Sequence, residues 1–97
     1  MAGEGAPGPD EPAQPGEMVA QLKELIAFLA KSLVDRPDEV EVEDFDEEDG
    51  LVFELTVAEE DLGRVIGRQG KTARALRTVL SAAAARLDRR VILEILE

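Results

Sequence analysis

The apolar residues change their spacing along the chain, and the order of these changes limits the folds available to it. Between Glu17 and Pro37 they recur with a helical period, on a stripe formed by Met18, Leu22, Leu25, Ile26, Leu29 and Leu33. Apolar residues occur at every second position in residues 40–43 and 51–57. The segment between these two stretches, 46–50, is acidic and ends in a glycine. This arrangement predicts one helix followed by an antiparallel hairpin.

The second half of the chain predicts two more helices and a strand. Residues 59–66 are typical of a short helix that Gly67 ends, and a longer helix is predicted from Gly70 to about Leu87. Its expected buried stripe consists of Leu76, Val79, Leu80, Ala83 and Leu87. Residues 91–96 form the last strand. Because two helices join the second and third strands, a right-handed crossover should make these strands parallel.

We therefore expect an α+β fold in the order α-β-β-α-α-β, with a three-stranded mixed sheet and all helices packed on one face. The second strand is the more apolar one, which places it in the middle of the sheet. Residues 1–16 hold four of the five prolines and are predicted to be a disordered, acidic, Gly/Pro-rich tail before a domain of residues 17–97.

Several classes of function are excluded by what the chain lacks. It contains no cysteine and no histidine, so thiolate nucleophiles, the usual transition-metal ligands and the ordinary general base at neutral pH are all missing. The acidic run from Asp44 to Asp49 does not fit an EF-hand, because Asp49 stands where that loop needs glycine. We expect a non-catalytic protein without metal or cofactor. No apolar run has membrane-span length, and the start lacks a signal-peptide pattern, which favours a cytoplasmic protein without membrane contact.

The charge is unevenly distributed. The chain as a whole carries a net charge of −11, but residues 64–97 contain eight basic residues against three acidic ones. A basic segment on an acidic body can still bind a polyanion. With only 3% aromatic residues, base stacking on aromatic side chains is not expected.

Two glycines bracket the link between the second and third helices, in the segment Gly67-Arg68-Gln69-Gly70. Glycine permits a positive φ and lets another backbone approach closely. The helix that follows starts at this loop and points its free N–H groups outward, which predicts an anion site. Arg68 lies at the tip, Lys71, Arg74 and Arg77 lie on one face of the next helix, and Arg64 comes from the preceding helix. A phosphate chain would meet these groups together.

The motif of two β-branched residues followed by Gly-x-x-Gly, within this element order, resembles a KH domain of the type II arrangement. The stretch from Leu62 to Lys71 and the alanine-rich helix after it resemble the small stand-alone bacterial KH proteins of the KhpA family, and the resemblance covers Met18 to Glu97. It implies binding of single-stranded RNA with little sequence preference and formation of homodimers. It also implies pairing with a larger KH-containing RNA-binding protein, as an RNA chaperone or post-transcriptional regulator linked to cell elongation and division.

By this resemblance the loop would clamp the backbone of about four nucleotides. Their bases would lie in a groove beside Leu62, Val65 and the neighbouring strand. The expected RNA-binding residues are Arg64, Val65, Gly67, Arg68, Gln69, Gly70, Lys71 and Arg74. Two features depart from the family: Ala73 stands where a large aliphatic residue is usual, and the chain is acidic. They leave open an alternative, an adaptor with a KH fold that dimerises with another KH protein and binds RNA poorly or not at all. A partly apolar free sheet face (Val52, Ile92) also favours this alternative.

Overall fold

The computed structural model describes residues 15–97. Residues 1–14, most of the predicted tail, lie outside the described residues. The helices are α1 (Pro15–Leu33), α2 (Leu62–Ile66) and α3 (Lys71–Ala83), the strands are β1 (Glu41–Glu47), β2 (Gly50–Thr56) and β3 (Val91–Ile95), and 3₁₀ turns cover Pro37–Glu39, Glu59–Asp61 and Arg68–Gly70. This order confirms the predicted sequence of elements. Within the described residues, no helix is long and apolar enough to cross a membrane.

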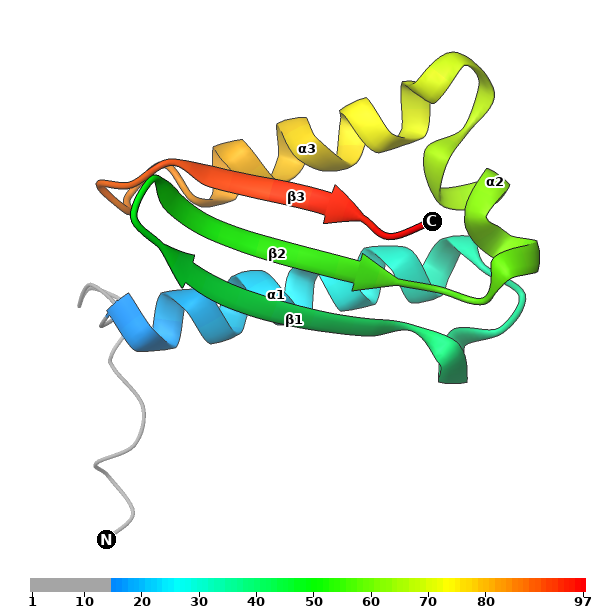
Figure 1. The fold of residues 1–97 in the computed structure, drawn as a ribbon, viewed down its shortest axis with the longest axis horizontal. Coiled ribbons are helices and arrows are strands. Elements are labelled where there is room, and N and C mark those ends of the chain that lie inside the picture. The colour runs from blue at the N-terminus through cyan, green and yellow to red at the C-terminus, as the bar shows by residue number, and fades with distance from the viewer. Residues whose placement is uncertain (1–14) are drawn as a thin grey trace, which may run out of the picture.

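The three strands form one mixed sheet in the order β1-β2-β3. β2 runs antiparallel to β1, with Glu41 opposite Thr56, and parallel to β3, with Leu51 opposite Val91. Helices α1 and α3 cover the same face of this sheet (Figure 1). The predicted fold class, with the second strand in the middle, is therefore confirmed.

The core lies between this sheet face and the helices. Its centre is Phe53 of β2, which is completely buried, and the residues packed around it are almost all aliphatic, among them Leu22, Ile26, Leu55, Leu80 and Leu93. The two other phenylalanines are not core residues, because Phe28 is 67% exposed and Phe45 is 40% exposed. One aromatic ring is enough because branched aliphatic side chains fill the remaining volume at the density of a protein interior.

The first helix begins and ends earlier than the sequence predicted. It starts at Pro15, two residues inside the expected tail, where proline suits the first turn because its missing N–H would have no partner there. It ends at Leu33, not at Pro37. The N–H groups of Asp35 and Arg36 donate to the side chain of Asp61. Since those amides are bound elsewhere, they cannot continue the helix.

The buried face of α3 is rotated from the predicted one. Ala73, Leu76 and Leu80 are buried, whereas Val79 is 43% exposed and Ala83 is also exposed. Steps of three and four residues place the buried side chains on one line, and Val79 lies about 100° away from Leu80. The helix also ends at Ala83 and not at Leu87.

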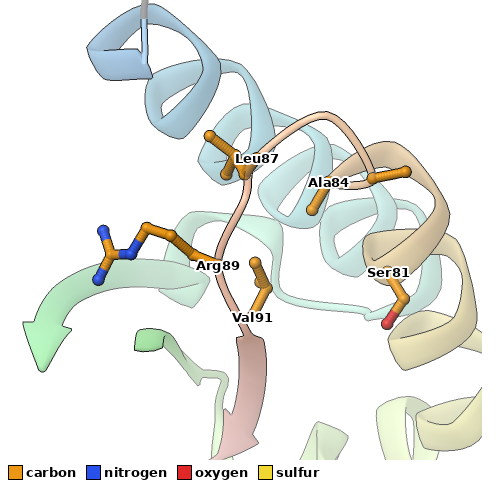
Figure 2. Close-up of a pocket in the computed structure, with 6 residues that line it drawn as sticks. Ser81, Ala84, Leu87, Arg89 and Val91 are labelled. Carbon is orange, nitrogen blue, oxygen red and sulfur yellow. The ribbon is translucent and has the colours of Figure 1, made fainter. Parts of the chain in front are cut away.

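The segment between α3 and β3 turns the chain back to the sheet. Leu51 donates its N–H to the carbonyl oxygen of Arg90 over 2.9 Å, which fixes the start of β3. Beside this segment lies a hollow of about 260 Å³ lined by Ser81, Ala84, Ala85, Leu87, Arg89 and Val91. The Arg89 side chain points away from the helix (Figure 2) and pairs with Asp46 of β1. This ion pair ties the segment to the β1–β2 hairpin.

The rotated face of α3 can be tested with two neighbouring residues. Leu80→Ala should lower the free energy of unfolding by about 2–5 kcal/mol, because it opens a cavity in the core. Val79→Ala, made at an exposed position, should change the unfolding free energy of the monomer by about 0.5 kcal/mol or less. Urea unfolding at low protein concentration measures both. Equal losses would show that the sequence-based stripe was right.

Candidate nucleic-acid interface

The loop between α2 and α3 contains three residues with positive φ. Gly67 has φ 77° and ψ 170°, Gly70 has φ 74° and ψ 14°, and Gln69 has φ 59° and ψ 24°. The positive φ expected of the two glycines is confirmed. Gln69 occupies the left-handed region without being glycine, which costs roughly 1–2 kcal/mol. Such strain persists only where the surrounding structure enforces it.

The two glycines serve different purposes. A Cβ atom at Gly67 would lie 2.8 Å from the backbone nitrogen of Thr72 and would also collide with its side chain. Gly67 therefore allows the loop to pack tightly on the start of α3. A Cβ atom at Gly70 would meet nothing within 4 Å. The backbone at Gly70 thus faces open space, from which another chain can approach it closely.

Part of the loop's hydrogen-bonding capacity is used internally. The N–H of Gly67 donates to the carbonyl oxygen of Gly63 over 2.8 Å, and the N–H of Gly70 donates to that of Gly67 over 3.0 Å. Lys71 N–H donates to the Arg68 carbonyl. Within residues 15–97, the amides of Arg68 and Gln69 have no backbone acceptor, and no side chain caps the start of α3. The donors left for an anion are therefore at the tip of the loop.

Unpaired positive charge is concentrated beside this loop. Arg68, Lys71 and Arg74 are exposed, and none has a carboxylate partner among the described residues. Four other basic residues, Lys23, Arg36, Arg64 and Arg89, are paired with carboxylates. Among residues 15–97 the other cations without a carboxylate partner are Arg77, further along α3, Lys31 of α1, and Arg86 and Arg90 of the segment between α3 and β3. The loop and the first turns of α3 thus carry the free charge that a phosphate chain requires.

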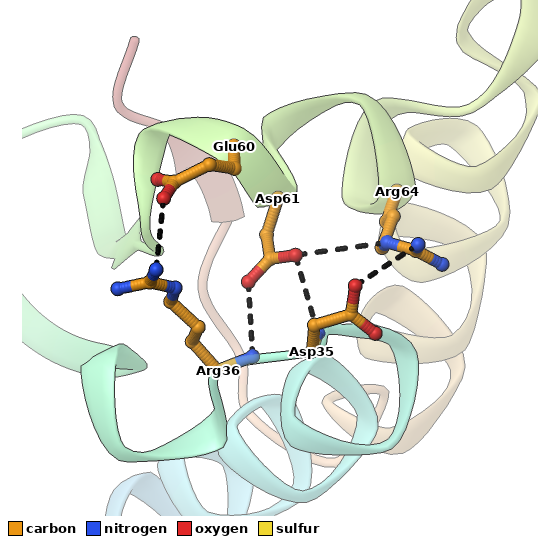
Figure 3. A network of polar contacts seen from close by, with 5 residues as sticks. All are labelled: Asp35, Arg36, Glu60, Asp61 and Arg64. Atoms are coloured by element: carbon orange, nitrogen blue, oxygen red, sulfur yellow. Dashed lines mark hydrogen bonds and ion pairs between the residues drawn. The ribbon is translucent and has the colours of Figure 1, made fainter.

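Arg64 differs from the prediction. Its guanidinium lies 3.0 Å from the Asp35 carboxylate and 3.6 Å from that of Asp61 (Figure 3). This cation is therefore already paired with two carboxylates and is not a free charge, although its side chain remains 55% exposed. Sequence spacing placed Arg64 near the loop correctly, but it could not show the acidic partner supplied by the end of α1.

Asp61 anchors the base of the loop, a role that the sequence did not reveal. Its side chain is almost completely buried, and its two oxygens accept the N–H groups of Asp35 over 3.2 Å and Arg36 over 3.1 Å. Arg36 in turn pairs with Glu60 at 3.3 Å (Figure 3). The carboxylate thereby joins the end of α1 to the start of α2, which leads into the loop. The partners are 25 and 26 residues apart in sequence, so no local pattern could identify them.

The two residues expected to line the groove for the bases are more buried than predicted. Val65 is completely buried in the core, which removes its side chain from direct contact with RNA, and Leu62 is partly buried against the same core. A groove of about 240 Å³ lies between α3 and β3, lined by Arg77, Leu80, Ser81, Arg90, Val91, Ile92 and Leu93. Ala73, the unusually small residue, is 5% exposed and packs inside.

Comparison with known proteins identifies the family. The sequence model described as the KH domain of KhpA and KhpB matches residues 23–95. This chain belongs to the KhpA/KhpB family of KH domains. It is 51% identical over 75 residues to the RNA-binding protein KhpA of Clostridium acetobutylicum, which covers 77% of this chain and all of that protein. It is also 51% identical over 74 residues to the RNA-binding protein KhpA of Borreliella burgdorferi, covering 76% of this chain and 90% of the relative. No solved structure matches the chain.

With the family known, the loop from Gly67 to Gly70 is the Gly-x-x-Gly segment of this KH domain. The structure brings together Arg68, Gln69, Lys71 and Arg74 around an accessible Gly70. Val65 belongs to the core, and Arg64 is already paired with two carboxylates. The other six of the eight residues expected from sequence are neither in the core nor paired with a carboxylate among the described residues.

The anchoring role of Asp61 predicts a clear stability difference. Asp61→Ala should lower the free energy of unfolding by about 2–3 kcal/mol, because two partly buried N–H groups lose their acceptor. Asp61→Asn should cost less, since its amide oxygen can still accept one bond. Glu60→Ala is the matched control: it removes a neighbouring carboxylate from an exposed pair and should cost about 1 kcal/mol or less. Urea unfolding distinguishes these variants, and equal losses for Asp61→Ala and Glu60→Ala would contradict the anchor.

Proposed function

We propose that this chain is a non-catalytic RNA-binding protein that grips the sugar-phosphate backbone of single-stranded RNA at Gly67-Arg68-Gln69-Gly70. The observation that carries the proposal is the combination of an open approach to Gly70 with unpaired cations on both sides of it. Two features of the loop suit a phosphate: the free amides at its tip and the uncapped start of α3. The curated relatives named RNA-binding proteins support the same ligand.

Phosphate contacts position the strand, and the bases lie to the side. Arg68 contacts the phosphates at the loop, and Lys71 and Arg74 follow the backbone along α3. The groove between α3 and β3 then receives the bases. It contains no aromatic side chain, so the bases are held by apolar contact and hydrogen bonds and not by stacking.

One small site of this kind binds weakly, and a homodimer would raise the affinity by placing two loops on one RNA. The outer surface of α1 and α3 suits such a dimer. A groove of about 260 Å³ there is lined only by uncharged residues, Leu29, Ser32, Leu33, Thr72, Ala75, Leu76 and Val79. On a chain of net charge −11, an uncharged surface is where two copies can meet with little repulsion. Because Thr72 adjoins Lys71, this dimer would bring the two loops near the interface.

The same uncharged groove could receive the KH domain of a larger RNA-binding protein, which gives the proposed heterodimer. In this proposal the chain acts in the cytoplasm as an RNA chaperone or post-transcriptional regulator linked to cell elongation and division.

A specific observation favours the adaptor alternative. The sheet face away from the helices carries Glu43, Glu54 and Glu94 directly opposite one another on the three strands. This row repels RNA, and Arg64 beside the loop is already paired with carboxylates, so less positive charge is free for a polyanion than the sequence predicted. Val52, expected to be exposed on this face, is only 6% exposed, so the face offers less apolar surface than predicted. The uncharged α1–α3 groove therefore suits an adaptor better than this sheet face.

RNA titration tests the proposed function. Fluorescence anisotropy with a short, unstructured single-stranded RNA should show log K falling with log salt with a slope of about −2, as expected for three neutralised phosphates. The double variant Arg68→Asp/Gln69→Asp should lose this binding and keep its fold by circular dichroism, because both side chains are exposed.

A charge-matched control separates local contact from net charge. Gln21→Asp/Lys31→Asp changes two exposed residues of α1 by the same total charge and should leave RNA binding nearly intact. If the loop variant and this control lose affinity equally, the loop is not the site. If the wild-type protein binds no RNA at low salt, the adaptor alternative replaces the proposal.

Sedimentation equilibrium tests the dimer surface. Val79→Asp should weaken self-association by more than about tenfold, because an unpaired carboxylate would have to be buried in the interface. Thr78→Asp adds the same charge one residue earlier, outside the groove, and should leave the dimer in place. A wild-type monomer at high concentration, or identical behaviour of the two variants, would exclude this surface.

A further inference from the structure

The free edge of β3 presents backbone groups to the proposed base groove. β3 pairs with β2 alone, since it is an outer strand of the sheet. The Arg90 carbonyl accepts from Leu51, and the Leu96 N–H donates to Leu55, so these residues direct their polar groups to β2. In a parallel ladder the bonded residues alternate. The N–H and C=O groups of Val91, Leu93 and Ile95 therefore point away from the sheet, toward the α3 side.

One of these edge groups is already occupied. The Nε–H of Arg77 donates to the carbonyl oxygen of Leu93 over 3.2 Å. Arg77 has no carboxylate partner within residues 15–97, so its terminal N–H groups remain available. At this point of the groove, Arg77 covers the Leu93 carbonyl, which is an acceptor, and presents its own terminal N–H donors in its place. A base lying there would meet a guanidinium where it would otherwise meet a carbonyl oxygen.

Arg77 is within reach of a strand held at the loop. It lies six residues after Lys71, which is about 9 Å along the helix axis. Lys71, Arg74 and Arg77 follow one another at three-residue intervals. A backbone that follows the first two cations carries its bases toward the groove that Arg77 and Leu93 line.

We propose that Arg77 sets the base preference of the groove, favouring the keto bases uracil and guanine over the amino bases cytosine and adenine. This inference rests on the proposed RNA-binding function. Uracil O4 and guanine O6 are acceptors, whereas cytosine N4 and adenine N6 are donors at the corresponding position. A guanidinium can donate a hydrogen bond to the keto oxygen of uracil or guanine. Beside the amino group of cytosine or adenine it places one donor against another, so no hydrogen bond forms between them. At this exocyclic position an amino group would find an acceptor only if Arg77 released the Leu93 carbonyl.

Short oligouridylate and oligocytidylate of equal length test the preference, because the two bases have the same size and differ at this exocyclic group. The wild-type protein should bind oligouridylate at least about fivefold more tightly, as expected for one well-placed hydrogen bond. In Arg77→Ala the Leu93 carbonyl is released as an acceptor, so the ratio should fall to one or reverse in favour of oligocytidylate. If Arg77→Ala only impaired folding, the affinities for both oligonucleotides would fall together and their ratio would stay the same.

Two controls separate the guanidinium from its charge. Arg86→Ala removes an unpaired cation of the segment after α3 that does not line the groove, and it should lower both affinities together. Arg77→Lys keeps the charge but not the planar donor array, and it should lose most of the preference. Equal binding of the two oligonucleotides by the wild-type protein, or an unchanged ratio in Arg77→Ala, overturns the inference and leaves the proposed function standing. Absence of binding to either oligonucleotide instead contradicts the proposed function itself.

Discussion

The carboxylate of Asp61 is the interaction on which the position of the functional loop depends. A buried carboxylate is tolerated when it is hydrogen-bonded or paired, and Asp61 accepts two backbone N–H groups and lies 3.6 Å from the Arg64 guanidinium. These partners come from the end of α1 and from α2. The carboxylate therefore sets where α1 ends and holds α2 in place. Since Gly67 directly follows α2, this also positions Gly67 against the start of α3.

The acidic character of the chain is compatible with a polyanion ligand because the charges are sorted in space. Carboxylates neutralise the basic residues that lie against the body, as Arg64 and Arg89 show. The basic residues of the loop and of the start of α3 have no such partner within the described part of the chain. The row of glutamates on the open sheet face adds repulsion on the opposite side of the molecule. Net charge then affects orientation and specificity more than it affects the ability to bind.

Local patterns predicted those parts of the structure that local chemistry determines. The alternation of apolar residues predicted the strands and the central position of β2, and the two glycines predicted the positive φ angles of the loop. The errors have tertiary causes. The sequence predicts a free cation at Arg64 because its partner Asp35 lies far away in sequence, in the segment after α1. It predicts a surface position for Val65 because sequence alone does not show which side of the short helix α2 meets the core. Asp61 looked like an ordinary acid in a first helical turn.

The apolar residues of α3 that the core leaves exposed point to a second contact surface. Sequence periodicity assigned Val79 and Ala83 to the core, yet the core uses only the line from Ala73 through Leu76 to Leu80. α3 is thus apolar over a wider arc than one core requires, and Phe28, on the neighbouring helix, is 67% exposed. A helix that carries more apolar surface than its own fold buries is typical of a second buried interface. The proposed dimer through the α1–α3 groove would account for the misleading periodicity at Val79, which lines that groove, because a pattern of apolar residues records burial in an assembly as well as burial within one chain.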